Sequence, residues 1–449
     1  MSKALPFITL PITTRFLTKE QISLLGIYSI IISMYSLCSQ FGLTYVINSQ
    51  WFKLANENRK VLLFNLFVIN LILSTFSIFL FLLLQNKLTP LLIGDVWLNF
   101  KELSLFIIIQ IFSVGFKSLF DGYMIIEKKI KWILILSLLS IIINTITFMY
   151  LVIEYSDIYI IIKSQSLIVL LFGSIYSIII INNSNFRFDI SFWKKTLRIG
   201  YPVFIRSIFN FARNRYDSIL AVNLLGGSNF AVYNFSKNVV SLNEYLAGAF
   251  DKSFSPYLYK KISEGSSNNR DFALLIYLYF TITVCGIYIF CICGKTLISF
   301  LTNNLFNESF DYILLLLIYV LFGIPTMCSG HILVSYEKTT WILWNTIFQF
   351  IILVSLSYFL YQPFGITGVL VSLCISNIIY SLNQYILSRK LFNLCIMERS
   401  LFLDTLLVLA GIMILYFHGS LLFISLVIVY IIYKLIKQFK DYKVTKDTI

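Results

Sequence analysis

Charged residues are scarce in this sequence of 449 residues, because Asp, Glu, Lys and Arg make up only 12% of it. A soluble domain carries about 25%. There are only two histidines, and none of the seven cysteines has the second cysteine pair or nearby histidine that a zinc site requires. Glycine-rich phosphate loops and serine-elbow motifs are missing as well. The sequence therefore predicts no metal, no cofactor and no sizeable soluble domain.

Apolar residues are abundant instead, at 58% of the chain, and the mean hydropathy is +0.84. Apolar runs of about 20 residues, long enough to cross a bilayer, follow one another with short connections. The first run is too short to span a membrane and lacks the features of a signal peptide, so we interpret it as the outer half of a helix whose beginning is missing or misassigned. We predict about fourteen membrane helices, at 4–14, 21–47, 61–84, 103–126, 132–153, 158–181, 199–225, 229–255, 272–293, 311–336, 340–360, 364–388, 401–417 and 420–436.

The distribution of basic residues predicts the orientation of these helices. With the N-terminus in the cytoplasm, most of the 35 lysines and arginines fall in cytoplasmic segments, including Lys434, Lys437, Lys440, Lys443 and Lys446 near the C-terminus. The opposite side holds only Arg15, Lys19, Lys87, Lys101 and Lys295. The net charge of +14 is thus explained by loops beside an anionic leaflet, and no nucleic-acid partner is expected. Both termini are predicted to be cytoplasmic.

Two weak internal repeats divide the chain into halves. LLGIYSIIIS (24–33) resembles NFAVYNFSKNVVS (229–241), and MIIEKKIKWILI (124–135) resembles LVSYEKTTWILW (333–344) at a similar offset. We predict an all-α fold with two six-helix lobes related by a pseudo-two-fold axis along the membrane normal, plus two C-terminal helices. The predicted parts are an N-terminal lobe (1–182), a basic cytoplasmic linker (183–198), a C-terminal lobe (199–390), two extra helices (391–437) and a cytoplasmic basic tail (438–449).

The predicted helix 199–225 carries charges where a bilayer should exclude them. At 100° per residue, four of its polar residues fall within an arc of about 60°. We call this set the Arg206 stripe, and its members are Arg206, Asn210, Arg213 and Asp217. An intramembrane arginine costs about 2.5–3.5 kcal/mol on insertion scales, so the stripe should face water or other charges. Arg215 points almost to the opposite side and is explained better by snorkelling.

Two more helices show the same pattern, each within an arc of about 40°. The Tyr233 stripe consists of Tyr233, Lys237, Glu244 and Asp251, and the Gln110 stripe consists of Gln110, Lys117 and Asp121. One interpretation is structural: Arg213 pairs with Asp217, and Lys117 with Asp121, to hold helices together.

The other interpretation is an anion-binding site. Cations outnumber acids in the predicted helices, and the planar, permanently charged guanidinium of arginine fits phosphate oxygens. An anionic substrate is therefore favoured. Among the acids, Asp217, Glu244 and Asp121 are candidates for exchanging H⁺ or Na⁺ during transport, although a structural role is equally compatible with the pattern.

Four stretches carry a family resemblance: FITLPITTRFLTKEQISLLGIYSIIIS (7–33), YPVF with NRYDSILAVNLLGGSNFAVYNFS (201–236), SPYLYKKIS (255–263) and PFGITGVLVSLCIS (363–376). Together they resemble the polysaccharide-transporter branch of the multidrug/oligosaccharidyl-lipid/polysaccharide (MOP) exporter superfamily, and O-antigen flippases in particular. The resemblance covers nearly the whole chain. Departures are the curtailed first helix and Ser218, where members often have arginine.

The resemblance implies a transporter rather than an enzyme, in a bacterial cytoplasmic (inner) membrane. Its substrate would be an undecaprenyl-diphosphate-linked oligosaccharide, moved to the outer leaflet by alternating access through a central cationic cavity. Arg206, Arg213, Lys237 and Lys117 would hold the diphosphate or acidic sugars, and Tyr233 and Asn210 would contact sugar. The resemblance also implies that Asp217 is a residue of this cavity, because of its position in the YDS motif. Membrane lipids and other proteins of polysaccharide assembly are the remaining candidate partners.

Three alternatives stay open. A peptidoglycan-precursor flippase would bind the same lipid diphosphate, and a multidrug exporter would share the architecture but favour an acidic, aromatic cavity. A membrane-embedded O-antigen polymerase or glycosyltransferase is disfavoured, because its chemistry requires a fixed set of catalytic groups in water and the predicted outer loops are short.

Overall fold

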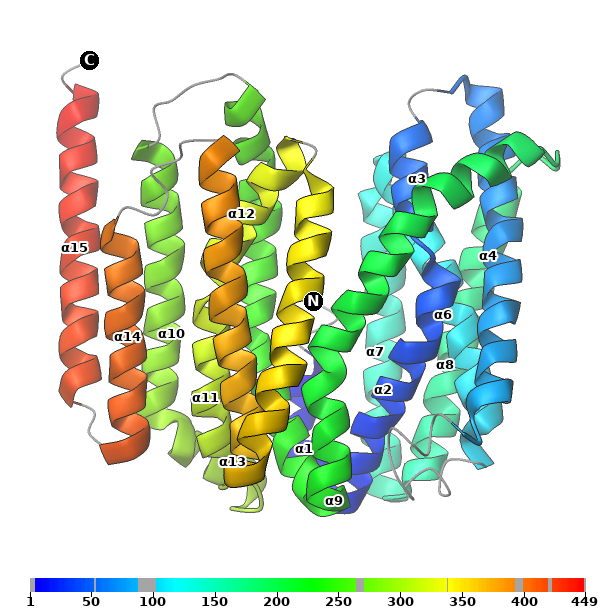
Figure 1. Ribbon diagram of the computed structural model, residues 1–449. Coiled ribbons are helices and arrows are strands. Elements are labelled where there is room, and N and C mark those ends of the chain that lie inside the picture. Colours follow the sequence, from blue (N-terminus) through cyan, green and yellow to red (C-terminus); the bar gives the residue numbers. More distant parts are fainter. Residues whose placement is uncertain are drawn as a thin grey trace. The chain divides into compact units, whose positions relative to one another are not determined.

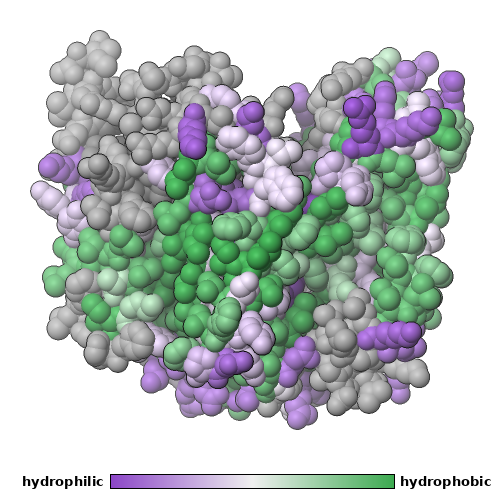
Figure 2. Space-filling view, viewed as in Figure 1, coloured by the Kyte–Doolittle hydropathy of each residue, from purple (hydrophilic) through white to green (hydrophobic). Residues whose placement is uncertain are grey.

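The computed structural model describes residues 5–51, 54–87, 102–263, 270–336, 338–391, 399–418 and 422–447, and these residues are almost entirely helical. Helices are expected because hydrocarbon offers no partners to backbone N–H and C=O groups, which must bond within their own segment. Within these described ranges, seven helical segments are long and apolar enough to cross a membrane. Hydrophobic residues gather over the middle of the helices and hydrophilic ones toward their ends (Figure 2). The predicted all-α, polytopic fold is confirmed.

The chain divides into two compact units, Met1–Ala231 and Val232–Ile449. The division falls inside α9 (Ile190–Ser263) and not in the predicted linker 183–198. Residues 190–198 are already helical, and the preceding loop bonds to unit 1, where the Asn185 N–H donates to the Lys60 carbonyl over 3.1 Å. The linker therefore packs with unit 1.

Unit 1 contains eight helices in its described part, counting the first leg of α9 (Figure 1). The first is short, as predicted, with 12 residues. The predicted helix 21–47 is broken in two by left-handed residues at Phe41 and Gly42. The helices before α9 are α1 (Leu5–Phe16), α2 (Lys19–Gln40), α3 (Leu43–Gln50), α4 (Asn56–Leu84), α6 (Ser104–Ile126), α7 (Ile130–Glu154) and α8 (Ile158–Asn182).

The core of unit 1 is built around α6, which contacts α2, α3, α4 and α8. Side chains of α3, α4, α6 and α8 form one apolar cluster that includes Trp51, Phe120 and Tyr176. A small residue lets α6 and α8 approach closely, since a Cβ added at Gly173 would lie 2.8 Å from Ser113 Oγ. By contrast, α7 leaves most of its apolar surface exposed to the surroundings, which in a bilayer are lipid.

Unit 2 begins within α9, which bends at Gly226 (φ 71°) just before the boundary between the units. A second bend, at Gly365 (φ 58°), divides α13 into two legs. Both bends occupy places where the sequence predicts separate helices. The other helices are α10 (Arg270–Thr302), α11 (Ser309–Leu321), α12 (Gly323–Ser335), α13 (Thr339–Leu391), α14 (Arg399–His418) and α15 (Leu422–Asp447). Helix α15 extends to Asp447, so most of the predicted tail 438–449 is helical.

Candidate functional site

The Arg206 stripe lies on the first leg of α9, which the break between α2 and α3 holds in place. Gly200 allows the contact, because a Cβ there would lie 2.7 Å from the Phe41 carbonyl oxygen. On the other side, Gly42 packs against Val203, and the Phe41 and Phe204 rings lie 5.0 Å apart between centroids. This close packing fixes the part of α9 directly before Arg206.

Arg206 and Arg213 are both half-buried. No hydrogen bond or ion pair joins the Arg206 guanidinium to any residue that the structure describes. The Arg213 Nε–H donates to Asn214 Oδ1 over 3.1 Å, a contact within its own helix. Arg206 therefore presents its donors to the surroundings of α9, where an anion would find them available.

The other two members of the stripe differ in burial. Asp217 is fully buried at 0% exposed, and Ser218 beside it is 3% exposed, whereas Asn210 is half-buried. A direct contact of Asp217 with a bulky substrate would therefore require the helix packing to open.

The members of the Gln110 stripe, on α6, have different surroundings in the structure. The Gln110 amide donates to Ser166 Oγ of α8 over 3.3 Å, and the Tyr28 hydroxyl meets the same oxygen at 2.9 Å. Lys117 is exposed and Asp121 half-buried, and within the described residues the two form no ion pair. Oδ1 of Asp121 is buried and has no hydrogen-bond partner there. The structural interpretation as an i,i+4 pair is therefore not supported for Lys117 and Asp121.

The Tyr233 stripe lies on the second leg of α9. Tyr233 is fully buried in unit 2, with its ring centroid 6.2 Å from that of Tyr312 in α11, while Lys237 is half-buried. The side chains of Glu244 and Asp251 fall outside the described residues. Stacking of Tyr233 on a sugar would require this packing to change, and the proposed roles of the stripe stay predictions.

Sequence reasoning missed a set of buried amides in unit 2. Asn345 and Gln349 on the first leg of α13 bond to the second leg, the former to the Tyr380 carbonyl over 3.2 Å and the latter to Asn377 over 3.4 Å. Asn377 in turn donates to the Tyr319 carbonyl of α11 over 2.9 Å. A signal was present, because Asn345 and Gln349 lie one turn apart and Asn377 and Gln384 two turns apart, each pair on one side of its helix.

Sequence reasoning also missed Asp404 in α14. It is 1% exposed and pairs with Lys434 of α15 at 2.5 Å. The distribution of basic residues assigns Lys434 to a cytoplasmic segment and does not predict this buried acidic partner in the neighbouring helix. No pattern in the sequence links two residues that lie so far apart.

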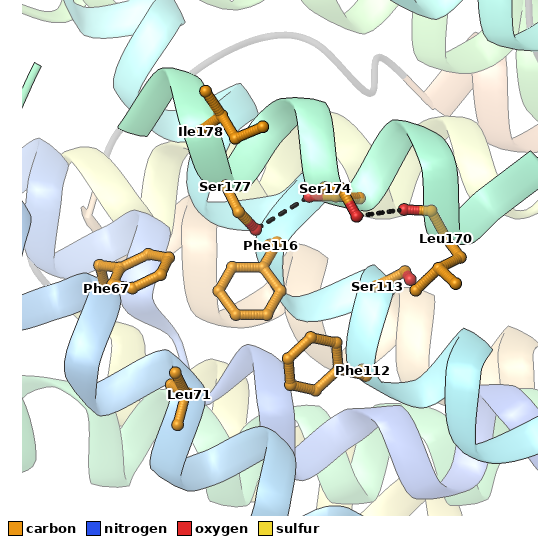
Figure 3. Close-up of a pocket in the computed structure, with 10 residues that line it drawn as sticks. Phe67, Leu71, Phe112, Ser113, Phe116, Leu170, Ser174, Ser177 and Ile178 are labelled. Atoms are coloured by element: carbon orange, nitrogen blue, oxygen red, sulfur yellow. Dashed lines mark hydrogen bonds between the residues drawn. The ribbon is translucent and has the colours of Figure 1, made fainter. Parts of the chain in front are cut away.

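One cavity in unit 1, of about 260 Å³, lies among α4, α6 and α8 (Figure 3). Phe67, Phe112 and Phe116 point into it, and Leu71 and Ile178 stand at its edges. Its serine hydroxyls bond to their own helices, as Ser174 does to the Leu170 carbonyl over 2.9 Å. The cavity contains no charged group and is unsuited to a diphosphate.

Comparison with known families decides the classification. A family model described as "Polysaccharide biosynthesis protein" matches residues 1–258, more than half of the chain. The chain belongs to this family. The resemblance to polysaccharide transporters predicted from the sequence is thereby confirmed at family level. No curated protein sequence matches the chain.

Solved structures share its fold. A lipid II flippase, MurJ, in an inward closed conformation has a TM-score of 0.73 and 16% identity, covering 99% of this chain and 98% of that one. An inward-facing multidrug resistance MATE family transporter of the MOP superfamily has a TM-score of 0.65 and 14% identity, covering 86% and 94%. The MATE transporter VcmN of Vibrio cholerae follows with a TM-score of 0.53 and 12% identity, covering 86% and 92%. At these identities the likeness establishes the fold alone.

Proposed function

We propose that this family member is a flippase for an undecaprenyl-diphosphate-linked oligosaccharide, such as an O-antigen repeat unit. It would move this lipid from the cytoplasmic to the outer leaflet of a bacterial inner membrane by alternating access, with both of its termini in the cytoplasm. Family membership and the fold shared with MurJ and MATE transporters support transport rather than catalysis.

The observation that carries the proposal is the state of Arg206. It is a half-buried cation in the predicted membrane helix 199–225, and it has no acidic partner among the described residues. Leaving such a charge without a partner in a helix bundle is unfavourable, and a phosphate ligand would remove that cost by supplying charge-assisted hydrogen bonds. In this proposal Arg206, Arg213, Lys237 and Lys117 bind the diphosphate or acidic sugars, and Asn210 and Tyr233 bind neutral sugar.

Coupling to H⁺ or Na⁺ forms a second part of the proposal, with Asp217, Glu244 and Asp121 as candidates. Asp121 is supported by its buried Oδ1, which has no donor among the described residues. A proton or a sodium ion would satisfy that oxygen. Replacing Asp121 by Asn should therefore impair transport while leaving the amount of protein in the membrane unchanged, whereas unchanged transport would remove Asp121 from the candidates.

The proposal is tested with Arg206→Ala and a control on the other side of the same helix, Arg215→Ala. Both variants would be expressed in a strain lacking the chromosomal gene, and surface polysaccharide, accumulated lipid-linked oligosaccharide and protein level would be measured. We expect Arg206→Ala to lose surface polysaccharide and accumulate the lipid-linked precursor, while Arg215→Ala retains function. Normal surface polysaccharide in the Arg206→Ala strain would contradict the proposal.

One alternative is favoured by a specific observation: MurJ, a lipid II flippase, covers nearly all of both chains in the structural match. Deletion of the gene separates the two functions. A peptidoglycan-precursor flippase that acts alone would be required for growth, whereas loss of an O-antigen flippase should remove surface polysaccharide from cells that still build a wall.

A further inference from the structure

Asp404 lies in the first part of α14 and is almost completely buried, at 1% exposed. Its Oδ2 accepts a hydrogen bond from the Tyr277 hydroxyl of α10 over 2.9 Å and lies 2.5 Å from the Lys434 Nζ of α15. Its Oδ1 is buried without a hydrogen-bond partner in the described part of the chain. One carboxylate oxygen thus joins three helices.

Lys434 is held on more than one side. Its side chain is 18% exposed, and its Nζ lies 5.4 Å from the Tyr277 ring centroid and 5.8 Å from that of Tyr430. A cation at this distance over an aromatic face is attracted by the ring quadrupole. The ammonium therefore has a fixed place between α10 and α14.

A second polar contact joins α10 to α15. The hydroxyls of Tyr288 and Ser425 lie 3.0 Å apart. Tyr288 follows Tyr277 by eleven residues, which places the two contacts roughly 16 Å apart along α10 at 1.5 Å per residue. Two attachment points at different depths prevent α15 from tilting or sliding on α10. In Figure 1, α15 and α14 lie beside α10 within unit 2.

A buried ion pair is a poor source of net stability, because desolvating both charges offsets most of their attraction. Breaking such a pair is costly nonetheless, since it leaves one charge without a partner. An ion pair between membrane helices therefore mainly favours one packing arrangement over others. Only the arrangement that brings Asp404, Lys434 and Tyr277 together avoids an isolated buried charge.

We propose that Asp404, Lys434 and Tyr277 form a clamp that fixes the α14–α15 hairpin to α10, so that the hairpin stays docked throughout transport. The hairpin is then a permanent part of unit 2 and not a separable appendage. This inference rests on the proposed function only in the experiment that measures transport as surface polysaccharide.

The first test compares the two charges by thermal unfolding of the purified full-length protein in detergent. Lys434→Met leaves a buried carboxylate with only the Tyr277 hydroxyl, so the melting midpoint should fall by several degrees. Asp404→Asn should lower it less, because the free lysine can extend toward the membrane interface. The double variant should recover stability relative to Lys434→Met. Additive losses in the double variant would overturn the clamp.

The second test fixes the hairpin covalently. In a background with the seven native cysteines replaced, Tyr288→Cys and Ser425→Cys would be combined and treated with a bifunctional methanethiosulfonate, which bridges the space left by the tyrosine ring through two reducible disulfides, with each single-cysteine variant as the control. We expect an intramolecular disulfide-linked bridge to form and surface polysaccharide to be the same with and without the reagent. Failure of the bridge to form, or loss of transport on cross-linking with recovery on reduction, would overturn the inference.

The two tests also separate the clamp from the proposed function. If the parent protein proves to have no role in surface polysaccharide, the proposed function fails. The melting midpoints and the yield of the disulfide-linked bridge would still support or overturn the clamp.

Discussion

The Asn65 side chain holds the backbone of Asp189, whose N–H donates to Asn65 Oδ1 over 3.1 Å. Asn65 is fully buried in α4, and its amide also donates to the Arg187 carbonyl over 2.9 Å and accepts from the Trp193 indole over 3.0 Å. A fourth bond, to the Val61 carbonyl, completes its hydrogen bonding. The loop before α9 is thus fastened to α4 through one side chain.

Replacing Asn65 by Leu should destabilise unit 1. The change keeps the volume similar but leaves the Arg187 carbonyl, the Asp189 N–H and the Trp193 indole N–H without their partner, at a cost of about 1–3 kcal/mol for each group that water cannot reach. Thermal unfolding in detergent would measure the loss. The Asn65→Asp variant retains the acceptor, so its thermal stability should lie between those of the Leu variant and wild type. A Leu variant as stable as wild type would contradict this account.

Asp189 begins α9, and its stabilising effect should depend on pH. The pKa of its carboxyl is lowered by hydrogen bonds from the Ser191 side chain and backbone N–H, and further by Arg187 and Lys195. Because the folded pKa lies below the unfolded one, the contribution is fully present above the ordinary aspartate pKa of about 3.9 and is lost as the pH falls through the folded value.

The measurement compares melting midpoints of wild type and Asp189→Asn between neutral pH and pH 3. Wild type should be the more stable protein at neutral pH, and the difference should shrink as the carboxyl becomes protonated. If the difference in melting midpoint grew on acidification, the predicted direction of the pH dependence would be wrong. Asp189 is only half-buried, so screening by solvent limits the size of the effect.

Gly173→Ala should separate α6 from α8. The new Cβ would lie 2.8 Å from Ser113 Oγ and 2.9 Å from Ser113 Cβ, closer than side chains pack. Overpacking of this kind costs about 1–3 kcal/mol. Ser174→Ala, at the next and more exposed position, is the control and should be nearly neutral. Adding Ser113→Gly to Gly173→Ala should restore part of the lost stability, and failure to do so would indicate another cause.

Arg206→Lys distinguishes charge from geometry in the proposed phosphate site. Lysine keeps the positive charge but lacks the planar fork that binds two oxygens at once. We expect Lys to retain more surface polysaccharide than Ala. An equal loss in both variants, at equal protein levels, would indicate that bidentate binding by the guanidinium is required.

The sequence predicts the helices well because hydrophobic runs of membrane length have few other structures available. It does not distinguish a loop from a bend. At Gly226 and at Gly365 the structure has one bent helix where the sequence predicts two separate helices. Each bend needs only one residue with positive φ, which glycine adopts without strain.

The candidate site is predicted less completely. Helical periodicity places the Arg206 stripe along one leg of α9, but it does not show which side chains other helices cover, and Tyr233 is fully buried. The pair of Asp404 and Lys434 is missed for a related reason. The positive-inside rule treats a lysine near a helix end as solvated, and only the packing of α14 against α15 reveals its partner.

Helix α7 has a consequence for the history of this protein. Only Phe148 and Val152 are buried along its length, and many of its apolar side chains are exposed to the surroundings, which in a bilayer are fluid lipid tails. Lipid tails can pack against apolar side chains of any shape. Natural selection on this helix should therefore preserve mainly its length and its hydrophobicity. Among homologues, α7 should accordingly diverge faster than α6, whose neighbours on several sides restrict every exchange.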